Sequence, residues 1–205
     1  VWPTSAGCLL GTWMLSGAGH VAISTGDLWV IASSVFWALH VLLVGRVADR
    51  FAARGYLAIA PSTFARVQQG VELGYTEQDM KAGFALKQAV GGLPGPGVLQ
   101  DIQAAIDWAR ERSGGKVGIV GFCWGGLLTW RSACTLEGLA AAVCYYGGGM
   151  TTPEESARQP RVPVLAHFGE RDHWIPLDTV QAFGRAHPEV EVHVYQADHG
   201  FNCDQ

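Results

Sequence analysis

Charged side chains make up only 16% of the 205 residues, and basic ones are not in excess. The formal net charge of −4 argues against a nucleic-acid partner, because such partners require a clustered basic face. The five cysteines are an odd number without regular spacing, which argues against a disulfide framework and favours a reducing compartment, the cytoplasm. Closely spaced Cys and His pairs are lacking too, so no structural zinc site is predicted.

The first 45 residues lack charge almost completely, since Asp27 is their one charged side chain. Residues 28–45 form an uncharged, largely apolar run of the length at which membrane-spanning helices begin. The run is followed by Arg46 and further arginines, which would favour a cytoplasmic C-terminal side. The alternative is a buried strand, LWVIA, followed by an apolar helix of a globular fold. Membrane contact is therefore expected, if at all, only through residues 7–45.

Beyond residue 46, short apolar runs alternate with segments of helical spacing. The predicted strands are 56–60, 116–122, 139–147, 162–169 and 190–196, and the predicted helices are 47–55, 77–90, 97–113, 124–135 and 176–186. Apolar strands that alternate with helices indicate an α/β fold, with a mostly parallel sheet covered by helices on both faces.

The stretch GFCWG at 121–125 follows one of these strands and has the pattern G-x-S-x-G with Cys123 in place of serine. In a nucleophile elbow, small residues on both sides allow a sharp turn from strand to helix. Such a turn would expose Cys123 at a helix N-terminus and aim the backbone N–H of Trp124 at an oxyanion. The alternative is a buried structural cysteine in a glycine-rich turn.

Candidate partners for this cysteine follow later strands. Asp172 comes just after the strand 162–169, and His199 just after the strand 190–196. In this architecture the chain order is nucleophile, acid and base, and all three residues fall at the carboxyl edge of the sheet. We therefore expect Asp172 to orient His199, and His199 to activate Cys123.

Other residues near these positions stay open as alternatives. His173 is a second candidate base, and Asp198 is a second candidate for the orienting acid. Two histidines inside predicted strands are expected to be packed or hydrogen-bonded in the core, and Cys203 is expected to be incidental: His167, His193 and Cys203. Substrate contacts are expected from three aromatic residues near the same edge: Tyr145, Trp174 and Phe201.

Residues 46–205 resemble the dienelactone hydrolase family, the carboxymethylenebutenolidase-like proteins, through VADRFAARGYLAIAPSTFARV, DIQAAIDWAR, GKVGIVGFCWGG, GERDHWIP and ADHGFNCDQ. The resemblance implies an α/β-hydrolase fold with Cys123, Asp172 and His199 as triad. It further implies hydrolysis of a small lactone or ester through a thioester, without metal or organic cofactor.

The chain departs from the family pattern near both ends. Where the family has a glutamate facing the resting cysteine, residues 30–36 read VIASSVF and contain no carboxylate. Residues 7–46 resemble more loosely a segment of drug/metabolite transporter-like membrane proteins. The chain stops at Gln205, where relatives continue into a further helix, so the fold is expected to be incomplete at both ends.

These observations divide the chain into an atypical segment, 1–45, and a hydrolase-like domain, 46–205. Three functions follow as hypotheses. The first is a cytosolic cysteine hydrolase of small lactones or esters, the second is a catalytically inert remnant of such an enzyme, and the third is a membrane-tethered protein.

Overall fold

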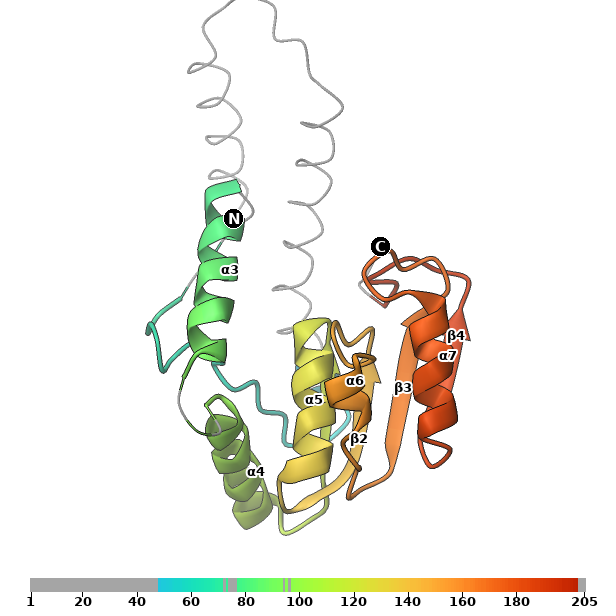
Figure 1. Ribbon diagram of the computed structural model, residues 1–205. Coiled ribbons are helices and arrows are strands. Elements are labelled where there is room, and N and C mark those ends of the chain that lie inside the picture. The colour runs from blue at the N-terminus through green and yellow to red at the C-terminus, as the bar shows by residue number, and fades with distance from the viewer. Residues whose placement is uncertain (1–47, 72, 74–76, 94, 96, 203–205) are drawn as a thin grey trace, which may run out of the picture.

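The computed structural model describes residues 48–71, 73, 77–93, 95 and 97–202 (Figure 1). After a short helix at 48–53, the elements run along the chain as α3 (Glu77–Gly91), α4 (Leu99–Ser113), β1 (Val117–Phe122), α5 (Trp124–Thr135), β2 (Leu139–Tyr145), α6 (Pro153–Ser156), β3 (Val164–Gly169), α7 (Leu177–Ala186) and β4 (Glu191–Tyr195). The strand–helix alternation predicted from residue 97 onward is confirmed. The additional short helix α6 falls in a segment for which neither a strand nor a helix was predicted.

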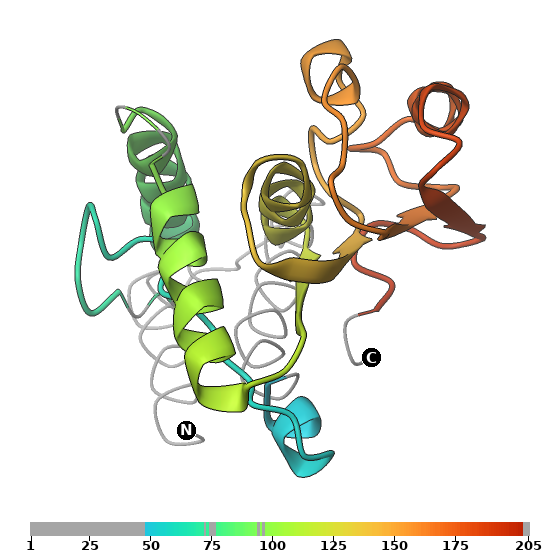
Figure 2. The same cartoon turned by 90° about the horizontal axis from the view of Figure 1, so that it is seen from below.

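The four strands form one parallel sheet in the order β1-β2-β3-β4. This confirms the predicted parallel α/β sheet for the described part of the chain. The connection between two parallel neighbouring strands is right-handed. In this sheet the spatial order of the strands is the same as their order along the chain. The connections through α5, α6 and α7 therefore lie on the same face of the sheet, as Figure 2 shows. All four strands consequently present their carboxyl ends at one edge.

The main core lies between this sheet and its helices. Trp130 of α5 is fully buried and packs edge-to-face on Phe183 of α7, and Phe168 of β3 packs edge-to-face on the same Phe183 ring. A second cluster joins α3, α4 and α5 through Val90, Ile102, Ile106 and Leu128, with Phe64 and Trp124 at its margin. Burial of apolar surface in these two clusters fixes α5 against β1 and β2 and holds α3 beside it.

The predicted strand at 56–60 is wrong. These residues form no strand, and Tyr56, Leu57 and Ile59 are exposed. An apolar run identifies a segment that gains from burial, but a strand also requires a neighbour with which to exchange backbone hydrogen bonds. The helix predicted before it, 47–55, is present at 48–53 and is followed by Gly55 with a φ of 86°.

Among the described residues, no helix is both long and apolar enough to cross a membrane. The apolar run 28–45 and the transporter-like segment 7–46 lie outside the described residues.

Candidate active site

Cys123 occupies a sharp turn between β1 and α5. Its backbone has φ 54° and ψ −118°, a conformation that side-chain-bearing residues seldom adopt, and α5 begins at the next residue. The Cys123 N–H donates to the carbonyl of Tyr145 at 3.0 Å, while the Cys123 carbonyl accepts from Gly126 at 3.0 Å. The turn is therefore held from both sides, and it lifts the thiol above the carboxyl edge of the sheet.

Two glycines make this turn sterically feasible. A Cβ on Gly121 would overlap the carbonyl of Gly125, and a Cβ on Gly126 would lie 2.7 Å from the carbonyl oxygen of Tyr145 and 2.9 Å from Cα of Gly147. A Cβ on Gly125, by contrast, would meet nothing within 4 Å. The motif places the small residue after the cysteine at Gly125. In the structure, the position after the cysteine where a side chain would collide with neighbouring backbone is Gly126.

Asp172 and His199 meet at the same edge. Asp172 follows β3 and is buried, and His199 lies four residues beyond the end of β4. The Nδ1–H of His199 donates to Oδ2 of Asp172 at 2.7 Å, and Oδ1 of Asp172 accepts the backbone N–H of Trp174 at 2.8 Å. Because a carboxylate only accepts, this pair assigns the proton to Nδ1 and leaves Nε2 for another partner.

Cys123 lies close enough to His199 for each side chain to shift the pKa of the other. Burial opposes a charged sulfur, but the hydrogen bond and charge of His199 and the N–H of Trp124 outweigh it, so the pKa of Cys123 is lowered. Burial also disfavours an imidazolium, but hydrogen bonds to Asp172 and Cys123 raise the pKa of His199 to about 9. The directions of these two pKa shifts favour a charged sulfur on Cys123 and a charged imidazole on His199.

The three aromatic residues predicted to touch substrate lie in different surroundings. Trp174 is 76% exposed, with its ring centroid 6.4 Å from that of His199. Tyr145 stacks on Phe122 at 5.0 Å and on His167 at 4.4 Å, whereas Phe201 packs on Tyr195 at 5.0 Å. Trp174 is thus an accessible wall beside His199, while Tyr145 belongs to a row of stacked rings across the sheet.

The alternative residues are placed elsewhere. Asp198 and His173 are exposed, and the carboxylate hydrogen-bonded to His199 is that of Asp172. His167 is buried, with Nδ1 2.9 Å from the hydroxyl of Tyr195, as expected for a core histidine. His193 was also expected in the core, but it is exposed and bonds Glu191. Cys203 lies outside the described residues.

Two ring contacts near the thiol were not predicted from the sequence. Tyr146, rather than Tyr145, is in ring contact with His199, at 4.9 Å between centroids. Phe64 stacks on Trp124 at 5.7 Å with the planes 10° apart. The loop that carries Phe64 is tied to α4 by an ion pair of 2.7 Å between Arg66 and Asp101. Neither ring pair could be found from spacing, because each joins segments that only folding brings together.

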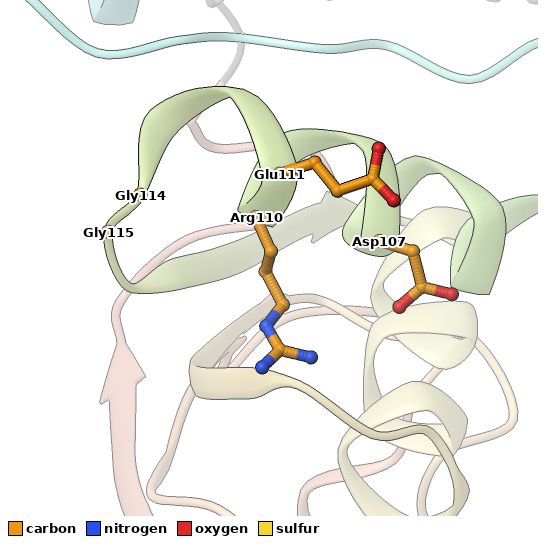
Figure 3. Close-up of a pocket in the computed structure, with 5 residues that line it drawn as sticks. All are labelled: Asp107, Arg110, Glu111, Gly114 and Gly115. Carbon is orange, nitrogen blue, oxygen red and sulfur yellow. The ribbon is translucent and has the colours of Figure 1, made fainter.

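A separate hollow of about 550 Å³ lies at the C-terminal end of α4 and is lined by Asp107, Arg110, Glu111, Gly114 and Gly115 (Figure 3). β1 starts just after it, so the hollow lies at the amino end of that strand, opposite to Cys123. It contains none of the predicted site residues. Within the described residues, no group of His, Cys, Asp and Glu side chains is arranged to hold a metal ion.

Comparison with known proteins identifies the same family that the sequence motifs resemble. The model of the "Dienelactone hydrolase family" matches residues 29–205 and so includes most of the apolar run 28–45. The chain is 36% identical over 157 residues to the carboxymethylenebutenolidase of Pseudomonas putida, an alignment that covers 72% of this chain and 64% of the relative. It is 31% identical over 175 residues to a Synechocystis protein provisionally given the same name, covering 78% of this chain and 70% of that one.

A solved structure supports the fold. The crystal structure of a protein from Klebsiella pneumoniae subsp. pneumoniae MGH 78578, provisionally named a dienelactone hydrolase, superposes with a TM-score of 0.61 at 32% identity. The superposition covers 78% of this chain and 70% of that one. The chain thus spans between 64 and 70% of the length of these three proteins.

Proposed function

Because the chain belongs to the dienelactone hydrolase family, a family of carboxylic ester hydrolases, we propose that it hydrolyses a small lactone or ester through Cys123, His199 and Asp172. The observation that carries the proposal is the 2.7 Å hydrogen bond between His199 and Asp172, supported by the pKa shifts that His199 and Cys123 cause in each other. An imidazole held in this way is the usual means of activating a nucleophile that sits on an elbow.

The proposed reaction starts from the thiolate–imidazolium pair. The sulfur of Cys123 attacks the carbonyl carbon, and the carbonyl oxygen becomes an oxyanion that accepts the N–H of Trp124. The carbon–oxygen bond to the leaving group then breaks, and His199 gives its proton to the departing alkoxide, which leaves a thioester. Water attacks this thioester with His199 as base, releases the acid and restores the thiol pair. Asp172 keeps the imidazole in the required tautomer throughout.

The proposal assigns domain 46–205 to this chemistry, with Trp174 as the exposed wall of the substrate site and Tyr145 and Phe201 as more remote aromatic contributors. The substrate is a small molecule, and the reaction as written uses no cofactor. A reducing compartment such as the cytoplasm suits a protein whose described cysteines, Cys123, Cys134 and Cys144, are all free thiols.

Hydrolysis of p-nitrophenyl acetate tests this function. We expect the purified chain to release p-nitrophenol catalytically and Cys123→Ala to reduce kcat/KM by at least about 10³-fold, as loss of a nucleophile does in other triads. Equal turnover by Cys123→Ala would refute the mechanism. Stoichiometric labelling of Cys123 by iodoacetamide without any turnover would instead favour an inert family member.

A further inference from the structure

Cys123 and Tyr146 are the only two non-glycine residues in the described part of the chain with positive φ, 54° and 36° respectively. They lie side by side, since Cys123 follows the end of β1, Tyr146 follows the end of β2, and the Cys123 N–H donates to Tyr145. Strained backbone in bulky residues persists only where the surrounding structure enforces it, and it concentrates at functional sites. One of the two carries the proposed nucleophile, which raises the question of what the other does.

The surroundings of Tyr146 explain how its backbone is held. The Tyr146 N–H donates to the carbonyl of His167 at 2.7 Å, which extends the pairing of β2 with β3 by one residue. The first turn of α5 presses on the other side, where Gly126 approaches the backbone of Tyr145 and Gly147. Between these two constraints the chain turns, and the side chain of Tyr146 is only 1% exposed.

The result is a rigid ring against the imidazole. The centroids of the Tyr146 and His199 rings are 4.9 Å apart, with the planes inclined by 58°. Trp174, the other ring near His199, is highly exposed and therefore free of comparable packing. A hydrogen bond at Nδ1 alone leaves an imidazole able to pivot about that bond, and a packed ring beside the imidazole restricts this rotation.

We infer that Tyr146 is a positioning residue, whose strained backbone packs its ring against His199 and thereby aligns the imidazole between Asp172 and Cys123. The inference rests on the proposed function in treating that thiol–imidazole pair as the catalytic one. Tyr146 itself acts through His199 and takes no part in bond making.

Alkylation of Cys123 by iodoacetamide as a function of pH tests this inference without any need for ester turnover. Tyr146→Leu removes the ring while keeping an apolar side chain, and Tyr146→Phe keeps the ring. In the Leu variant we expect Cys123 to be alkylated about three- to tenfold more slowly at neutral pH, which is the change in rate that corresponds to the loss of one aromatic ring contact. The pH profile of alkylation should also move to higher pH. The Phe variant should follow the wild type.

Phe183→Leu is the matched control, because it removes another fully buried ring from the same core. The ring of Phe183 contacts the rings of Trp130, Phe168 and His187. It should destabilise the fold but leave the alkylation profile unchanged. If Tyr146→Leu does not fold, Tyr146→Met removes the ring with a different flexible side chain. With p-nitrophenyl acetate, the loss of the ring should lower kcat with little effect on KM.

A Tyr146→Leu profile that superposes on the wild-type profile would overturn the inference, as would equal losses in the Leu and Phe variants, which would assign the effect to the hydroxyl. An equal shift in Phe183→Leu would reduce the role of Tyr146 to general stability. A wild-type protein that alkylates readily but never turns over ester would refute the proposed function alone, since the alkylation comparison still decides the role of Tyr146.

Discussion

The Nδ1–H of His199 donates to Oδ2 of Asp172 at 2.7 Å, across 27 residues of chain. The two residues come together because β3 and β4 are adjacent and parallel, so that the loops after them leave the sheet at the same edge. Backbone bonds fix these loops to each other, with Glu170 donating to the carbonyl of Tyr195 and Arg171 to that of Ala197. The orientation of the imidazole is thus a consequence of sheet pairing.

The three described cysteines should react very differently with iodoacetamide. The pKa of Cys123 is lowered, whereas burial raises the pKa of Cys134 to about 12 and raises that of Cys144 further. Since only the thiolate reacts, Cys123 should be alkylated at pH 7 while Cys134 and Cys144 stay unmodified in the folded protein. Peptide mapping by mass spectrometry after a brief exposure measures this, and urea-unfolded protein is the control in which all three should react.

Labelling of Cys134 as fast as Cys123 in the folded protein would contradict the environment described for both thiols.

The pH dependence of kcat/KM should be bell-shaped. The thiolate requires a pH above the lowered pKa of Cys123, and proton donation requires a pH below the His199 pKa of about 9. Asp172 contributes to the raised pKa of His199, so Asp172→Asn should move the alkaline limb to lower pH. It should also reduce kcat by about 10²- to 10⁴-fold, by analogy with other triads that lose their orienting acid. Hydrolysis of p-nitrophenyl acetate from pH 5 to pH 10.5 measures both effects.

Asp198→Asn is the control for this profile, because Asp198 is exposed and next to His199 in sequence. Its alkaline limb should coincide with that of the wild type. A shift in Asp198→Asn together with an unchanged limb in Asp172→Asn would make Asp198 the orienting acid.

Alanine at Gly126 should destabilise the protein, and alanine at Gly125 should not. At Gly126 the new Cβ would meet the backbone of Tyr145 and Gly147, which cannot rotate away, and overpacking of this kind costs about 1–3 kcal/mol. At Gly125 there is space, and alanine favours a helix over glycine by about 1 kcal/mol. Urea unfolding of both variants measures the two free energies. Equal stability of Gly126→Ala and wild type would show that α5 does not press on β2 as described.

The order of elements from residue 97 onward followed from the sequence alone, because apolar strands and amphipathic helices carry their own periodicity. Cys123, Asp172 and His199 could be selected for a similar reason, since a parallel sheet sends every strand end to one edge whatever the side-chain details. The 56–60 segment shows where this reasoning fails. Its apolar residues are as strand-like as those of β1, but in the described structure it has no ladder and three of its large side chains are exposed.

What the sequence determined by itself was therefore the composition of the proposed site: the candidate nucleophile, the candidate acid and the candidate base, in an order set by the chain. Only the tertiary structure decided that Gly126 rather than Gly125 admits the close approach, that Tyr146 rather than Tyr145 contacts His199, and that Phe64 stacks on Trp124. Periodicity reports on neighbours along one element, whereas these contacts join separate elements at distances of a few ångströms, and it is packing that sets such distances.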